Sequence, residues 1–122
     1  MSAPTVAQYA AIEAMKNGDD DIEAMKAEYD KRRRFLYDGL RKIGFPCSEP
    51  RGAFYCFPRV DGFGLGDAEF CERLLLDEKV AIIPGSAFGP GGEGHARCCY
   101  AADMDKIGEA LKRMEKFVNS LK

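Results

Sequence analysis

The residue with the clearest chemical potential is Arg97, an arginine inside the otherwise apolar run 96–102. A guanidinium in such a run is costly to bury unless an anion or a carbonyl group meets its planar set of N–H donors. Two kinds of partner are possible: the carboxylate of a bound substrate, or a structural salt bridge to a loop carboxylate such as Glu93. The residues by themselves leave both possibilities open.

A glycine-rich loop at residues 85–94 lies between the apolar run 80–83 and the run that contains Arg97. Backbone N–H groups of such loops often bind phosphate. Phosphate-binding loops lead from a strand into a helix, however, whereas a strand is expected after these glycines. The pattern therefore favours a long connection between two strands, and His95 beside it is expected to be a solvated turn residue without an assigned role.

The five cysteines form neither a C-x-x-C pair nor a zinc-binding spacing, and their odd number argues against a disulfide framework. We expect them to be reduced and mostly buried, and we expect no metal site. A catalytic cysteine would need a histidine base, and nothing in the sequence places His95, the single histidine, next to a thiol.

Length and composition fit one domain of 122 residues, with 46% hydrophobic and 31% charged residues. The net charge of −2 gives no basic face for nucleic acid, and no apolar run approaches the length of a membrane-spanning helix. We therefore expect a cytoplasmic protein that binds neither nucleic acid nor a membrane. The basic run 31–34 is expected to be a solvated helix face that pairs locally with Glu28 and Asp38.

Hydrophobic periodicity and end signals predict four helices. The first is expected at residues 6–16, capped by Thr5, and it is apolar on more than one side, which indicates a partner beyond its own neighbours. The second is expected from the acidic residues at 19–21 to residue 43, with Gly44 as its stop and an apolar stripe along its length. The third and fourth are expected to be capped by Asp67 and Asp103 and to run to about residues 79 and 121. Their inner faces are formed by two sets of apolar residues: Phe70, Cys71, Leu74 and Leu75 on the third, and Met104, Ile107, Leu111, Met114, Val118 and Leu121 on the fourth.

Strands are predicted at residues 52–60, 80–83 and 96–101. Helices gathered around a few strands that do not alternate with them indicate an α+β fold. We expect a small, three- to four-stranded, mostly antiparallel sheet with helices packed on one side.

Several motifs together resemble the C-terminal part of class I/II aminotransferases, the fold-type I enzymes that depend on pyridoxal phosphate, and most closely the aspartate aminotransferase-like branch. The resemblance covers nearly the whole chain and includes the helical segments 8–14 and 29–34. It implies an N-terminal helix from an inter-domain boundary at residues 1–18 and the small domain at residues 19–122. The motifs are Gly52-Ala53-Phe54-Tyr55, Val80 to Gly89, Gly92 to Arg97, and Tyr100-Ala101.

The resemblance implies that Arg97 binds the α-carboxylate of an amino-acid or 2-oxo-acid substrate through two parallel hydrogen bonds. It places Gly52, Tyr55 and Ser86 at the border of the cleft. The family's Schiff-base lysine, its other catalytic groups and its cofactor site belong to a large N-terminal domain that would precede this chain. We therefore expect no catalytic residue and no bound pyridoxal phosphate in this chain, which would be inactive alone, and a homodimeric complete enzyme.

Two alternatives remain at this point. The chain could be a stand-alone carboxylate-binding or regulatory module without catalytic activity. The complete protein could also be a related pyridoxal phosphate lyase or synthase, because carboxylate-binding arginines serve those reactions too.

Overall fold

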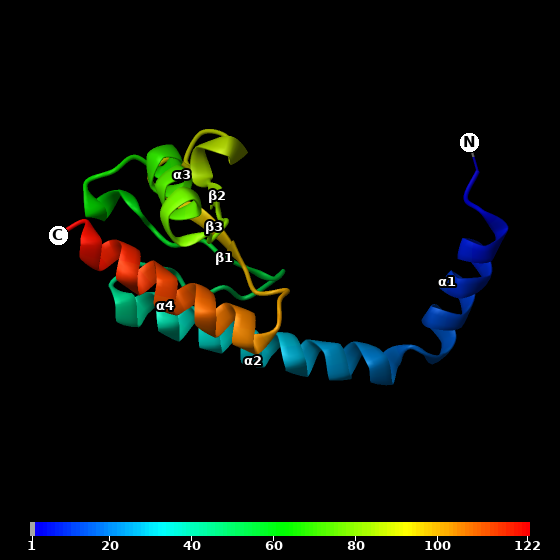
Figure 1. Ribbon diagram of the computed structural model, residues 1–122. Helices are drawn as coiled ribbons and strands as arrows, with labels where there is room; N and C mark the ends of the chain where they lie inside the picture. Colours follow the sequence, from blue (N-terminus) through cyan, green and yellow to red (C-terminus); the bar gives the residue numbers. More distant parts are fainter. Residues whose placement is uncertain (1) are drawn as a thin grey trace.

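The computed structural model describes residues 2–122 and shows a folded body of helices and strands from which one helix projects (Figure 1). The α+β class predicted from the sequence is confirmed: helices and a small antiparallel sheet share one core. The helices are α1 (Thr5–Asn17), α2 (Asp19–Ile43), α3 (Asp67–Glu78) and α4 (Met104–Ser120). The strands are β1 (Tyr55–Cys56), β2 (Ile83–Pro84) and β3 (Ala96–Cys99), and two 3₁₀ turns are η1 (Asp61–Phe63) and η2 (Gly85–Phe88).

The sheet has the order β1-β3-β2, and β3 pairs antiparallel with both neighbours. Cys56 lies opposite Cys98 in one pair, and Ile83 lies opposite Arg97 in the other. Each strand is shorter than predicted. The expected strand at 52–60 is reduced to β1 and an isolated bridge between Arg59 and His95, and the expected strand at 96–101 contracts to β3. The expected strand at 80–83 is wrong except at Ile83, because β2 also includes Pro84, which was expected to end it.

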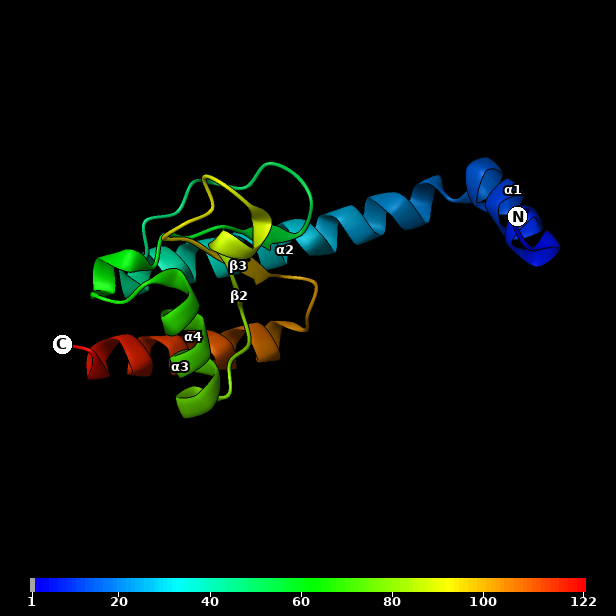
Figure 2. The same ribbon diagram turned by 90° about the horizontal axis from the view of Figure 1, so that it is seen from above.

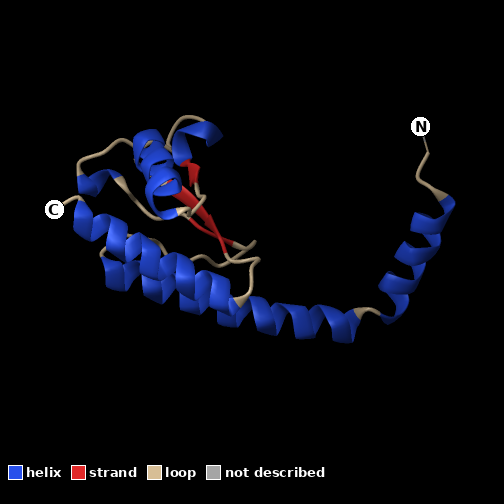
Figure 3. Cartoon of the chain, viewed as in Figure 1, coloured by secondary structure: helices blue, strands red, loops and turns tan. Residues whose placement is uncertain are grey.

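Two features of the backbone explain the short first strand. Ala53 has a positive φ of 55°, which is outside the extended region and interrupts the strand at its start. Pro58 has no N–H to donate, so the ladder after Cys56 is reduced to the bond from the Ala96 N–H to the Pro58 carbonyl at 3.0 Å and the bridge between Arg59 and His95. The sheet is therefore small, and helices make up most of the regular structure of the chain (Figure 3).

The helices begin and end near the predicted residues, but none of the predicted side-chain caps forms a capping hydrogen bond. Gly44 ends α2 with a φ of 109°, and its N–H donates to the carbonyl groups of Leu40 and Arg41, as predicted. The predicted cap at Thr5 is wrong, because Thr5 is already helical and Pro4 occupies the cap position. Asp67 likewise lies inside the first turn of α3 rather than at its cap. Asp103 does occupy the cap position of α4, but its side chain makes no capping hydrogen bond.

The core lies between the second half of α2, α3, α4 and the sheet, and the long helices α2 and α4 run side by side (Figures 1 and 2). The side chain of Leu111 packs directly on Gly39, where a Cβ atom would not fit without movement. The buried stripe of α4 is confirmed for its central residues and also includes Phe117, which the predicted rhythm omitted, whereas Met104 is exposed and Leu121 is only partly buried. On α3, Leu75 was expected in the core but is 47% exposed.

Among the described residues, none before Leu36 belongs to the buried core. No residue of α1 is buried, and α1 projects away from the folded body beyond the start of α2 (Figure 1). The apolar stripe predicted along α2 is buried only from Leu36 onwards, whereas Ile22 and Met25 are more than half exposed. The division at residue 18 stays a prediction. Within the described residues, no helix is both long enough and apolar enough to span a membrane.

The basic run on α2 forms local ion pairs, as expected, but with a different set of acids. Arg32 pairs with Glu28 at 2.9 Å, whereas the expected pairs to Asp38 are replaced by pairs to Asp30. Arg33 also reaches out of the helix to Glu49 at 2.7 Å and donates to the carbonyl oxygen of Pro50 at 3.3 Å. This second contact fixes the connection before β1 to α2.

Tyr100 provides a test of this packing, because its ring is 98% buried and its hydroxyl donates to the carbonyl oxygen of Ala53 at 2.8 Å. We expect Tyr100→Phe to lower the free energy of unfolding by about 1–2 kcal/mol, since the Ala53 carbonyl would lose its partner. Chemical denaturation of both proteins measures this difference. Tyr9→Phe on α1, where the ring is 71% exposed, is the matched control and should change nothing; equal stability of all three proteins would contradict the prediction.

Candidate functional site

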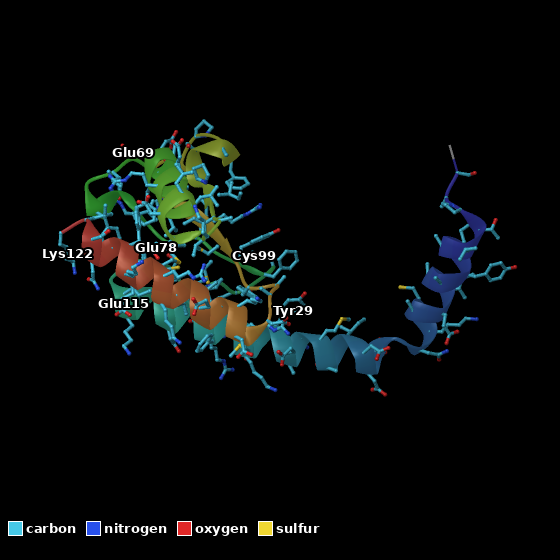
Figure 4. The ribbon with its side chains drawn as sticks, in the orientation of Figure 1. Tyr29, Glu69, Glu78, Cys99, Glu115 and Lys122 are labelled. Carbon is cyan, nitrogen blue, oxygen red and sulfur yellow. The ribbon has the colours of Figure 1, made fainter. Side chains whose placement is uncertain are left out.

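Arg97 lies on the central strand β3, and its side chain is half-buried between two aromatic rings. The guanidinium carbon is 4.4 Å from the centre of the Tyr55 ring and 4.6 Å from the centre of the Phe88 ring. Both distances allow cation–π attraction, which fixes a guanidinium without using its N–H donors. Cys99, two residues further along β3, points to the same face of the strand and lies on the side of the folded body nearer to α1 (Figure 4).

The structural salt bridge considered for Arg97 is not formed. The carboxylate of Glu93 instead accepts a hydrogen bond from the backbone N–H of Gly91 at 2.8 Å and so closes a turn. Within residues 2–122, no carboxylate lies within ion-pair distance of Arg97, and its guanidinium makes no hydrogen bond. The donors of Arg97 are therefore available to a ligand.

The N–H groups of the glycine-rich loop bond to other groups of the protein, both within the loop and on α3. The N–H of Gly85 donates to the His95 carbonyl at 2.7 Å, and that of Gly92 donates to the Gly89 carbonyl at 3.1 Å. The N–H of Ser86 donates to the carboxylate of Asp67 at 2.8 Å, and this bond lowers the pKa of that carboxyl below its usual range. With these donors engaged, the loop is a connection between strands, as the sequence indicates, and a phosphate cradle is not formed.

His95 is a turn residue, as expected, but it is only partly solvated. Its ring stacks on Phe57 with 5.3 Å between the ring centres, and its Nδ1 atom lies 2.9 Å from the Glu93 carbonyl oxygen. Phe57 also contacts Phe88, with 6.4 Å between their ring centres. Phe57 thus packs between the ring of His95 and the ring of Phe88, which contacts Arg97.

Of the predicted cleft residues, Tyr55 contacts Arg97 through its ring. Ser86 lies at the start of η2, two residues before Phe88, and is engaged through its backbone. Gly52 lines a separate open groove of about 480 Å³ beside α2, together with Tyr29 (Figure 4), Arg33, Glu49 and Tyr100. The roles of Gly52, Tyr55, Ser86 and Arg97 in binding stay predictions.

Arg33 forms ion pairs with two of the acidic residues that line this groove. Its guanidinium donates to Glu49 and Asp30, and this contact holds the pKa of the Glu49 carboxyl below its usual range. Both acids are therefore neutralised by the protein itself.

Phe88 is the site residue that the sequence analysis missed. Its contact with Arg97 depends on the 3₁₀ turn η2, which folds the chain back directly after β2. One feature of the sequence could have indicated Phe88: it is an aromatic residue inside the glycine-rich loop that connects two predicted strands.

Comparison with known proteins assigns this chain to a family. The family described as "Aminotransferase class I and II" matches residues 1–114, and the chain belongs to it. The chain is 48% identical over 119 residues to the "Putative aminotransferase YugH" of Bacillus subtilis, covering 98% of this chain and 31% of that protein. It is 44% identical over 120 residues to the "Aspartate aminotransferase" of Pyrococcus abyssi, covering 97% of this chain and 31% of that protein.

A solved structure supports the same assignment. The aromatic aminotransferase from Pyrococcus horikoshii superimposes with a TM-score of 0.89 at 43% identity, covering 93% of this chain and 31% of that one. The chain thus spans about a third of the length of the relatives it matches. The resemblance to the C-terminal part of these enzymes is confirmed.

Membership of this family implies pyridoxal phosphate in the complete enzyme. The residues that the structure places around Arg97 are aromatic or aliphatic, and no lysine is among them. Lys26 and Lys31 on α2 pair with Glu23 and Glu28. The rings around Arg97 and its partner on β2 therefore supply no lysine to this cofactor.

Proposed function

We propose that this chain is the substrate-carboxylate-binding domain of an aminotransferase that transfers an amino group between an amino acid and a 2-oxo acid. The observation that carries the proposal is Arg97: a half-buried guanidinium held between two rings, with no carboxylate of the described chain on its donors. A planar carboxylate matches two of those donors at once. The relatives named above are all aminotransferases, which supports transfer over a lyase or synthase reaction.

The arrangement performs two tasks in this proposal. The paired hydrogen bonds from Arg97 fix one end of the substrate and so orient the bonds at its α-carbon. The rings of Tyr55 and Phe88 cover the faces of the guanidinium, which strengthens its charge interactions because they exclude water. The electron-accepting chemistry is supplied by pyridoxal phosphate in the complete enzyme.

The remaining machinery is assigned to a preceding large domain, which would carry the cofactor, its lysine and the main dimer contacts. The share of the relatives that the chain covers, about a third, supports this partner. The unburied α1 and the exposed residues Ile22 and Met25 on α2 support contact with more protein at the N-terminal side.

The test compares the complete polypeptide of the source cell with residues 1–122. An antibody raised against this chain should detect a polypeptide several times larger than 13.5 kDa. The purified complete protein should form an amino acid from 2-oxoglutarate and an amino-acid donor, followed by chromatography, and residues 1–122 should not. A native polypeptide of this size, or a complete protein without amino transfer, would overturn the proposal.

A further inference from the structure

His95 precedes Arg97 by two residues at the start of β3, and both side chains point to the same face of the sheet. The isolated bridge between Arg59 and His95 keeps the register in which β1 pairs with β3. In this register Phe57 lies opposite Arg97, and directly opposite Cβ atoms of an antiparallel pair are about 4.5–5.5 Å apart. The side chains of His95 and Phe57 therefore belong to the immediate surroundings of Arg97.

The His95 ring is held on two sides. Its Nδ1 atom lies 2.9 Å from the carbonyl oxygen of Glu93, and because a carbonyl oxygen only accepts, Nδ1 carries the proton of this hydrogen bond. The face of the ring stacks on Phe57, with 5.3 Å between the ring centres and 2° between the ring planes. The backbone of His95 is fixed as well, since its carbonyl oxygen accepts a hydrogen bond from the Gly85 N–H at 2.7 Å. The loop before β3 and the ring of Phe57 thus set the orientation of the imidazole.

Phe57 connects the His95 ring to the aromatic residue that covers Arg97. The rings of Phe57 and Phe88 meet at 70°, with 6.4 Å between their centres. The centre of the Phe88 ring is 4.6 Å from the guanidinium carbon of Arg97. Phe57 is 38% exposed and Phe88 is 50% exposed. Because exposed side chains change rotamer readily, contacts with neighbouring rings restrict these two phenylalanines where the rest of the protein covers them incompletely.

We propose that His95 is a positioning residue for the Arg97 site. Its ring holds Phe57, Phe57 holds Phe88, and Phe88 keeps the guanidinium of Arg97 in the orientation that receives a carboxylate. This inference rests on the proposed function, because it assigns His95 to the same substrate site. His95 acts through the two rings and needs no contact with the substrate. Without this support the guanidinium would sample several orientations, and substrate binding would have to restrict it.

Two substitutions separate the ring of His95 from its hydrogen bond. His95→Phe keeps a ring against Phe57 and loses the donor to Glu93, whereas His95→Asn keeps a side-chain N–H and loses the ring. In the complete protein we expect His95→Phe to keep kcat/KM for an amino-acid donor within about twofold, and His95→Asn to lower it by about tenfold. The loss should appear as a higher KM for the amino acid and for the 2-oxo acid with kcat nearly unchanged, because the ground state and the transition state both need the oriented guanidinium.

A double-mutant cycle distinguishes positioning from a general effect on the fold. Once Arg97 is replaced by lysine, no guanidinium plane remains to be oriented, so adding His95→Asn should lower kcat/KM by less than about twofold. The control cycle uses Arg113→Lys, at a partly exposed arginine on α4, and adding His95→Asn there should still lower kcat/KM by about tenfold. A substitution that only loosened the fold would lower kcat/KM equally in all three backgrounds.

The outcomes separate this inference from the proposed function. A complete protein without amino transfer, or one with the same kcat/KM after Arg97→Lys, would overturn both. Where Arg97→Lys has its expected effect, three results would overturn the role of His95 alone: no loss in His95→Asn, an equal loss in His95→Phe, or the same loss from His95→Asn with and without Arg97→Lys. If the His95→Asn protein does not fold, Phe57→Leu, which removes the next ring, takes its place in both cycles with the same expected results.

Discussion

Replacing Arg97 by lysine in the complete protein should lower kcat/KM for an amino-acid donor by about a hundredfold, or about 3 kcal/mol of transition-state binding. Lysine keeps the positive charge but offers a compact ammonium in place of two parallel N–H donors, so it cannot hold a carboxylate in one plane. It also loses the flat surface that the rings of Tyr55 and Phe88 contact at 4.4 and 4.6 Å. Arg97→Ala removes the charge as well and should cost more.

Kinetics of both substrates separate loss of binding from loss of orientation. We expect KM to rise for the amino acid and for the 2-oxo acid, because each carries the carboxylate that Arg97 would bind. We expect kcat to fall too, since a substrate held by one hydrogen bond samples unproductive orientations at its α-carbon. An unchanged kcat/KM in both variants would remove Arg97 from the proposed site.

A matched control excludes a general effect of losing an arginine. Arg113 on α4 is partly exposed, pairs with Glu109 at 2.8 Å and donates to the Glu78 carbonyl oxygen at 3.2 Å, and a solvated pair of this kind contributes little. Arg113→Lys should therefore leave kcat/KM unchanged. Thermal unfolding of all variants shows whether the fold is kept.

The helices could be predicted from sequence because their signals are local. Gly44 ends α2 as expected, since a left-handed residue there depends only on the neighbouring turn. Whether an apolar face is buried is a different question: Ile22 on α2 and Leu75 on α3 follow the apolar rhythm but are exposed. Periodicity shows which side of a helix is apolar, and only the tertiary arrangement shows whether another element covers that side.

The strands and the site were harder to predict, because they also depend on the tertiary arrangement. Pro58 and Ala53 shorten β1 although the residues between them suit a strand. Arg97 stood out because a charge inside an apolar run is locally conspicuous. The contact of Phe88 with Arg97 depends on the path of the loop between β2 and β3, which no local pattern specifies.

A substitution in that loop, Gly85→Ala, should strongly lower the stability of the protein. Gly85 is buried, and a Cβ atom added there would overlap the Gly92 carbonyl group and lie 2.9 Å from the His95 carbonyl oxygen. These neighbours are backbone atoms, so no side chain can rotate away to make room. We expect Gly85→Ala to lower the free energy of unfolding by about 3 kcal/mol or more, and the melting temperature by about 10 °C or more.

Gly62→Ala is the matched control, because nothing lies within 4 Å of a Cβ atom added at that position in η1. It should change stability by less than about 0.5 kcal/mol. Denaturant unfolding of the three proteins measures the difference, and a Gly85→Ala protein as stable as Gly62→Ala would show that the two loop backbones do not meet. Gly85 begins the turn that brings Phe88 onto Arg97. A Gly85→Ala protein that still folds should therefore bind a substrate carboxylate more weakly. The Gly62→Ala protein should bind it as the unchanged protein does. The same glycine therefore links the stability of the loop to the geometry of the proposed site.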